Sequence, residues 1–127
     1  MTVTGGRPRV LLISRDLFFT SKVTGTAAAM GIDVRVAADA AAAAQCARSE
    51  RFCCLFIDLA DTGLDVAAFF SLLGPERVAP VVAFGSHVAT ARLQAARDAG
   101  CDEVMPRSRF SASLPDLLKK YAGMSSS

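Results

Sequence analysis

The chain has 127 residues, of which 52% are apolar and 20% are charged, and its formal net charge is +2. This composition excludes disorder over most of the length and suits a single domain, residues 1–127, with flexible tails at 1–8 and 123–127. The small net charge argues against nucleic-acid or membrane-surface binding, and no apolar run reaches the length of a membrane span. The N-terminal residues lack the apolar segment of a signal peptide, so we expect a cytoplasmic protein.

The first predicted unit is a strand at 9–13 followed by a helix at 17–30. Asp16 is the predicted N-cap of that helix, because its short carboxylate can accept a bond from a backbone N–H of the first turn. Gly31 follows the helix where a glycine commonly ends one. Residues 32–36 then alternate apolar and polar side chains, which indicates a strand at the edge of a sheet.

The middle of the chain carries the strongest strand pattern. Asp39 is expected to cap an alanine-rich helix at 40–49, since alanine has the highest helix propensity. The apolar run 52–57 reads as a strand buried on both faces, and it stops at Asp58. A helix at 65–73 follows. Asp58 therefore lies at the carboxyl end of a buried strand, where parallel sheets place their ligands.

A third apolar strand is predicted at 80–84, followed by a helix at 87–99 with Ser86 as its cap. A poorer strand is expected at 102–106, where a proline marks the end.

The last predicted elements are a loop at 107–110 and a helix from about 113 to 122. Pro115 is expected in the first turn of that helix, where the missing N–H costs nothing.

Five strand–helix units of this length predict an α/β domain with one parallel sheet and helices on both faces, a flavodoxin-like (βα)5 sandwich. The strand order of that class is 2-1-3-4-5, and its ligands lie at the ends of the first and third strands. Leu12, Ile57 and Val82 should be buried at the centre of the sheet. The residues expected to face one another across a pocket at the strand ends are Ser14, Arg15, Asp16 and Asp58.

Four cysteines, at 46, 53, 54 and 101, show no CxxC motif and no metal-ligand spacing. We interpret them as reduced thiols that pack as small apolar side chains.

In this order, the elements and short motifs resemble the receiver domain of bacterial response regulators, from about residue 9 to 121. The run 52–58 and the following Thr62-Gly63-Leu64-Asp65 resemble the phosphoacceptor strand and loop of that family. Gly100-Cys101-Asp102-Glu103 resembles the turn that enters its fifth strand. The resemblance implies that Asp58 stands at the phosphoacceptor position.

The other functional positions of the family hold different residues here. Ser14 and Arg15 stand where receivers carry two acidic residues that hold Mg²⁺, and Asp16 comes one position late. The hydroxyl position falls on Gly85 with Ser86 one step beyond, the aromatic switch position on Val104, and the lysine position on Arg107. We therefore expect no Mg²⁺ and no other cofactor, and we expect Arg15 or Arg107 to pair with Asp58.

The resemblance and these departures from it imply an atypical receiver, or pseudo-receiver, which is expected not to be an enzyme and to act by protein–protein interaction in two-component-type signalling. The expected partners are signalling proteins, such as a histidine kinase or an output protein, and a homodimer is left open. One alternative is a conventional receiver in which a histidine kinase phosphorylates Asp58. Another is a small-molecule sensor that uses the pocket at the strand ends.

Overall fold

The computed structural model describes residues 7–60, 65–74 and 79–126, so the predicted loop around Gly63 and most of the predicted leader lie outside it. Strands and helices alternate along the chain. The strands are β1 (Arg9–Ile13), β2 (Asp33–Ala37), β3 (Cys54–Asp58), β4 (Val81–Gly85) and β5 (Glu103–Pro106). The helices are α1 (Leu17–Ala29), α2 (Ala40–Ser49), α3 (Val66–Leu73), α4 (Thr90–Ala99) and α5 (Arg107–Ser126).

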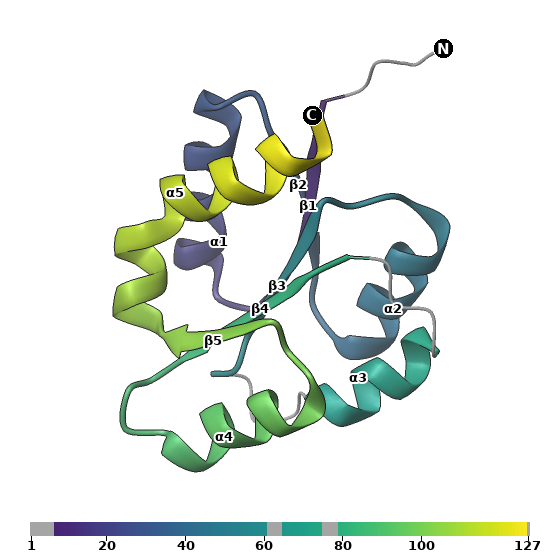
Figure 1. Ribbon diagram of the computed structural model, residues 1–127, viewed down its shortest axis with the longest axis vertical. Helices are drawn as coiled ribbons and strands as arrows, with labels where there is room; N and C mark the ends of the chain where they lie inside the picture. The colour runs from purple at the N-terminus through teal and green to yellow at the C-terminus, as the bar shows by residue number, and fades with distance from the viewer. Residues whose placement is uncertain (1–6, 61–64, 75–78, 127) are drawn as a thin grey trace.

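The five strands form one parallel sheet in the order β2-β1-β3-β4-β5, which confirms the predicted fold class. Helices α1 and α5 cover one face of the sheet, and α2, α3 and α4 cover the other (Figure 1). The predicted order places β2 at an edge, and the polar alternation of its sequence fits that place. Within the described residues, no helix is both long and apolar enough to cross a membrane.

Each face of the sheet carries its own apolar core because side chains alternate along every strand. On the α1–α5 face, Leu12 and Val82 pack with phenylalanines from β3, β4 and α5. On the other face, Ile57 packs with Phe69 of α3. The three residues predicted at the sheet centre, Leu12, Ile57 and Val82, are all fully buried. Full burial of such a side chain stabilises the fold by about 1.5–3 kcal/mol.

The predicted caps Asp16 and Asp39 are confirmed, and Asp65, predicted only as the start of a helix, caps a third. The side chains of Asp16, Asp39 and Asp65 accept hydrogen bonds from backbone N–H groups in the first turns of α1, α2 and α3. Gly31 follows α1 with φ +77°, a conformation that L side chains rarely adopt. The chain therefore enters its first three helices as the local sequence predicts.

The predicted start of α4 is wrong. The Ser86 hydroxyl accepts a bond from the Val88 N–H, and the Ser86 carbonyl accepts one from Ala89, so these residues form a separate turn. The helix begins only at Thr90, and Ala89 precedes it without a side-chain cap. A serine that bonds its own following backbone competes with the helix, which explains the later start.

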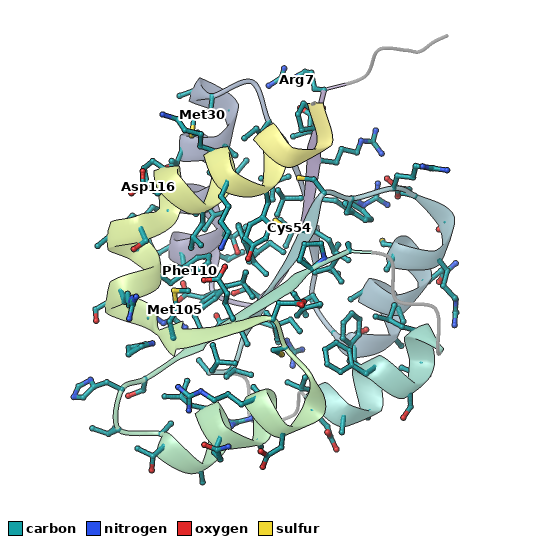
Figure 2. All side chains as sticks on the ribbon, viewed as in Figure 1. Arg7, Met30, Cys54, Met105, Phe110 and Asp116 are labelled. Carbon is teal, nitrogen blue, oxygen red and sulfur yellow. The ribbon has the colours of Figure 1, made fainter. Side chains whose placement is uncertain are left out.

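The predicted loop at 107–110 is also wrong, because α5 begins at Arg107 and runs to Ser126. Phe110 is fully buried and stacks on Phe84 with ring centroids 4.1 Å apart, which fixes this segment against the sheet; Figure 2 shows Phe110 between α5 and the sheet. Pro115 consequently lies inside the helix and not in its first turn. The ribbon of α5 changes direction part-way along (Figure 1), as expected where a proline removes a helical hydrogen bond.

Candidate functional site

Asp58 ends β3 at the carboxyl edge of the sheet, and its side chain is only 3% exposed. The strand pairs with β1 on one side and β4 on the other, so loops from both neighbours surround the carboxylate. A buried carboxylate is costly unless charged or polar partners surround it. Three groups satisfy it here.

The first two partners come from the adjoining loops. The Ser14 hydroxyl, at the end of β1, donates to Asp58 Oδ2 at 2.8 Å. The backbone N–H of Ala60 donates to Asp58 Oδ1 at 2.9 Å. Ser14 is itself buried, and its oxygen also accepts the backbone N–H of Asp16 at 3.1 Å. These bonds hold the carboxylate in one orientation.

The third partner is the guanidinium of Arg107 at the start of α5. Its Nη2 lies 2.7 Å from Asp58 Oδ1, and its Nη1 lies 3.4 Å from Oδ2 of Asp16. The prediction that a cation pairs with Asp58 is thus confirmed for Arg107. The Arg107 side chain is 28% exposed, so solvent screens this pair only in part.

Two phenylalanines support the guanidinium. The Arg107 carbon Cζ lies 4.7 Å from the ring centroid of Phe19 and 5.6 Å from that of Phe84. A cation over an aromatic face is attracted by the ring quadrupole, and a stacked guanidinium loses rotational freedom. The sequence prediction did not include these two residues. The sequence offered one signal for them, which is that each lies close to a predicted site residue. Phe19 lies three positions after Asp16, and Phe84 lies directly before Gly85.

The remaining predicted pocket residues contribute less. The Arg15 residue is exposed, whereas its neighbour Ser14 points into the site, as alternation at a strand end requires. Asp16 faces the site only from its rim, because its Oδ1 accepts the Phe19 N–H and caps α1. Ser86 is exposed and bonded within its own turn.

Gly85 and Val104 face the side of the sheet that α2, α3 and α4 cover, opposite to the α1–α5 face. A Cβ added at Gly85 would lie 3.1 Å from the Cβ of Leu59, so the residue after Asp58 occupies the room that a side chain would need. Val104 packs with the core beneath α2, α3 and α4. Neither residue brings a hydroxyl or an aromatic ring to Asp58.

The groups around Asp58 differ from the oxygen ligands that Mg²⁺ prefers. That ion prefers about six oxygen ligands in octahedral geometry, usually from carboxylates and water. Apart from the backbone N–H of Ala60, the groups on the Asp58 carboxylate are the neutral hydroxyl of Ser14 and the guanidinium of Arg107. Within the described ranges, no group of three or more potential His, Cys, Asp or Glu ligands is present either.

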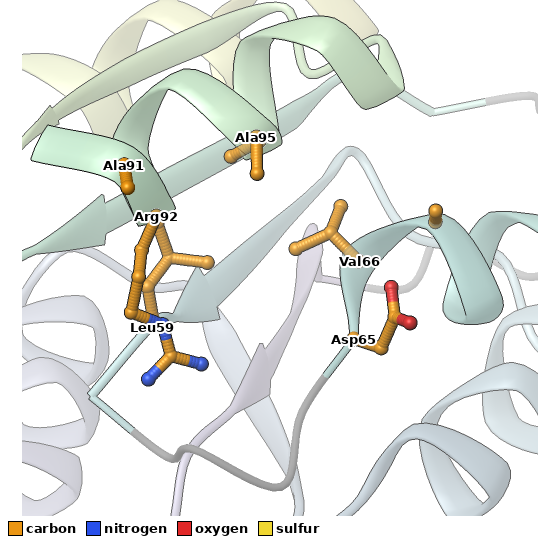
Figure 3. A pocket seen from close by; sticks show the side chains of 8 residues that line it. Leu59, Asp65, Val66, Ala91, Arg92 and Ala95 are labelled. Atoms are coloured by element: carbon orange, nitrogen blue, oxygen red, sulfur yellow. The ribbon is translucent and has the colours of Figure 1, made fainter.

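A separate cavity of about 300 Å³ lies between the start of α3 and α4. Figure 3 shows Leu59, Asp65, Val66 and Arg92 among the side chains that line it. Neither Asp58 nor Arg107 lines this cavity, so it is not the pocket that the strand ends were expected to form.

Comparison with known proteins gives the fold. Neither a protein-family model nor a curated protein matches the chain. Among solved structures, the receiver domain of a sensor histidine kinase from Pseudomonas aeruginosa is 18% identical, with a TM-score of 0.78 over 94% of this chain and 99% of that one. A two-component response regulator from Clostridium difficile is 16% identical, with a TM-score of 0.79 over 95% and 100%. The chemotaxis response regulator CheY4 of Vibrio cholerae is 17% identical, with a TM-score of 0.75 over 91% and 98%. The chain therefore has the receiver fold.

Proposed function

We propose that this chain is a pseudo-receiver, a receiver-type module that acts by protein–protein contact in two-component-type signalling without Mg²⁺-dependent phosphorylation. The observation that carries the proposal is the 2.7 Å ion pair between Arg107 and Asp58. A cation of the protein itself neutralises the carboxylate at the phosphoacceptor position.

The chemistry of phosphoryl transfer supports this function. Transfer to a carboxylate concentrates negative charge that a metal ion must neutralise. At about 4 Å, two unit charges interact by roughly 4 kcal/mol at an effective dielectric of 20, so a dication and a guanidinium would repel by about twice that. Binding Mg²⁺ beside Asp58 would thus require Arg107 to leave both carboxylates and its stacking on Phe19.

The residues that would transmit a phosphorylation signal are also replaced. Receivers move a hydroxyl toward the phosphoryl group and rotate an aromatic side chain behind it. Gly85 has no side chain here, and Val104 is short and packed in the core of the other face. A phosphoryl group on Asp58 would make nearly the same contacts in any two conformations of the domain. It would therefore not shift the equilibrium between those conformations.

The inferred partner is a signalling protein, either a histidine kinase or an output protein. The proposed role involves no binding to nucleic acid or membrane and no catalysis by this chain. A homodimer is one form that such contact can take. The receiver fold, with 94% of the chain aligned to a kinase receiver domain, supports this class of partner.

The runner-up is a conventional phosphoaccepting receiver. Asp58 at the carboxyl end of β3 favours it, and so does the similar Pseudomonas receiver domain, whose active-site cleft coordinates a magnesium ion. A small-molecule sensor is the second alternative, and the cavity between α3 and α4 is one place where a ligand could bind.

Two assays separate these functions. The parent and an Asp58→Asn variant are incubated with Mg²⁺ and a small acyl phosphate, and the intact masses are compared. We expect no phosphoryl adduct on either protein, and we expect both to capture the same partners from solution. A parent adduct that disappears in Asp58→Asn, together with loss of partner binding, would establish the conventional receiver instead.

A further inference from the structure

Two large apolar side chains at the start of α1 face solvent. Leu17 is 80% exposed and Phe18 is 92% exposed, whereas the next residue, Phe19, is buried in the core. Because an α-helix has about 3.6 residues per turn, adjacent residues point to different sides of it. The two phenylalanines are therefore divided between the core and the surface. Leu17 and Phe18, which we call the apolar knob, form a small exposed patch of the kind that marks contact sites.

The cavity between α3 and α4 has a size and a lining that suit such a knob. Its volume is about 300 Å³, and Figure 3 shows the side chains that line it. Most of them are apolar and short: Leu59, Val66, Ala67, Ala91, Ala95 and Ala96. An apolar cavity of about 150 Å³ already holds a benzene molecule. The cavity between α3 and α4 therefore has room for the benzyl side chain of a phenylalanine.

The knob and the cavity of one chain lie apart. Helix α1 covers one face of the sheet, and α3 and α4 cover the other (Figure 1). Phe18 is almost fully exposed and is not among the residues that line the cavity. An aromatic side chain that fills a pocket of a partner is the usual centre of a protein–protein contact. The knob of one copy can thus enter the cavity of another copy.

The charges beside the two surfaces are complementary. Lys22 is exposed and lies four residues after Phe18, on the same side of α1. Asp65 lines the cavity and is also exposed, so a seated knob brings a cation beside an anion. Arg92 lines the cavity as well, and its charge has the same sign as that of Lys22. A guanidinium is attracted to the face of an aromatic ring, so Arg92 suits Phe18 itself.

We propose that the chain binds a second copy of itself by seating the apolar knob of one copy in the cavity between α3 and α4 of the other. Phe18 is the anchor, and Lys22 and Asp65 fix its approach. The proposal rests on the protein–protein role proposed above and names a second copy as the partner. Its test is separate from that of the proposed function, because none of the substitutions below replaces a residue that contacts Asp58.

Sedimentation equilibrium of the full chain measures the association. Contacts around one anchor are at the low end of interface size and affinity, so the samples should span roughly 10 µM to 2 mM. We expect the average mass of the parent to rise with concentration. Phe18→Ser and Ala95→Leu should each weaken the association by more than about tenfold, because one removes the anchor and the other fills the cavity.

Matched controls change equally exposed positions outside both surfaces. Val88→Ser removes another apolar side chain that is 73% exposed, and Ala41→Leu enlarges an exposed alanine of α2. Both controls should associate as the parent does. The two weakened variants carry different defects, so mixing them tests the pairing. Phe18→Ser keeps the cavity and Ala95→Leu keeps the knob, and we expect the mixture to form a one-to-one dimer.

Amide chemical shifts locate the contact in that mixture. With Phe18→Ser isotope-labelled, adding unlabelled Ala95→Leu should shift the amides of Val66 and Ala96 saturably. A parent that stays monomeric over the whole concentration range would overturn the proposal, and so would a mixture that does not associate. If the parent is monomeric while N-acetylphenylalanine amide shifts the same amides, the cavity belongs to another partner and the second copy is refuted.

Discussion

Replacing Arg107 by methionine should destabilise the fold, because it removes the cation that pairs with the buried Asp58. The change removes the guanidinium that lies 2.7 Å from Asp58 and leaves a carboxylate that is 3% exposed without a cation. Breaking a buried ion pair from one side typically costs about 3–5 kcal/mol. Methionine keeps the length and much of the apolar contact of the arginine stem, so the variant isolates the charge.

The expected cost is smaller than the upper end of that range for two structural reasons. The Arg107 side chain is 28% exposed, and Asp58 keeps its bonds from Ser14 and Ala60. We expect about 2 kcal/mol from the unpaired carboxylate. Loss of the stacking on Phe19 adds about 0.5–1 kcal/mol. The total loss in the free energy of unfolding is therefore about 3 kcal/mol.

Urea denaturation followed by far-ultraviolet circular dichroism at pH 7 measures this loss. The matched control is Arg109→Met, an exposed arginine two residues along the same helix, which should change stability by less than about 0.5 kcal/mol. In the Asp58→Asn background, Arg107→Met should cost only about 1 kcal/mol, because no buried charge is stranded. If Arg107→Met costs no more than Arg109→Met, or costs the same in both backgrounds, the ion pair does not hold Asp58.

Three further predictions concern other residues of the structure. Ile57→Ala should cost about 2–5 kcal/mol, because the side chain is fully buried in the sheet; a thermal melt equal to that of the parent would refute its central place. Tyr121→Phe should cost about 1–2 kcal/mol at pH 7 by removing the bond that Tyr121 donates to Glu103. The bond from Tyr121 is the largest cause that lowers the pKa of Glu103 below its ordinary value of 4.5. The stabilisation from this bond is therefore present above pH 4.5 and is lost as the pH falls through the lowered pKa. A cost of Tyr121→Phe that stays constant down to about pH 3 would contradict this. Ser14→Asp with Arg15→Asp should make the melting temperature rise with millimolar Mg²⁺, whereas a parent stabilised by Mg²⁺ would show that the acidic positions are misplaced.

The fold could be predicted because each buried strand has a continuous apolar sequence and each of the first three helices has an aspartate cap. The parallel order then follows from the regular alternation of strands and helices. The errors came where tertiary contacts override local sequence. The α5 helix begins at Arg107 because Phe110 stacks against Phe84 and Arg107 pairs with Asp58, and no local pattern at 107–110 encodes those contacts.

The polar residues Ser14, Asp58 and Arg107 of the site could be predicted, but their pairing and the supporting rings of Phe19 and Phe84 could not. Sequence position placed Ser14 and Asp58 at adjacent strand ends, and the structure joins them by a 2.8 Å hydrogen bond. It left open whether Arg15 or Arg107 pairs with the carboxylate. Which arginine pairs with Asp58 depends on the direction of each side chain. The rings of Phe19 and Phe84 support the guanidinium of Arg107 and so favour it. Both rings lie far from Arg107 in the sequence, and a periodic pattern does not reveal such contacts.

The most direct test of the proposed function is an amide chemical-shift titration with Mg²⁺ followed by beryllofluoride, which mimics a phosphoryl group on a carboxylate. With Arg107 paired to Asp58, we predict no saturable shifts at Asp58, Ala60 or Gly85 up to millimolar Mg²⁺, and none after beryllofluoride is added. Saturable shifts of these amides with both reagents would show that the carboxylate accepts a metal and a phosphoryl mimic, which would contradict the pseudo-receiver.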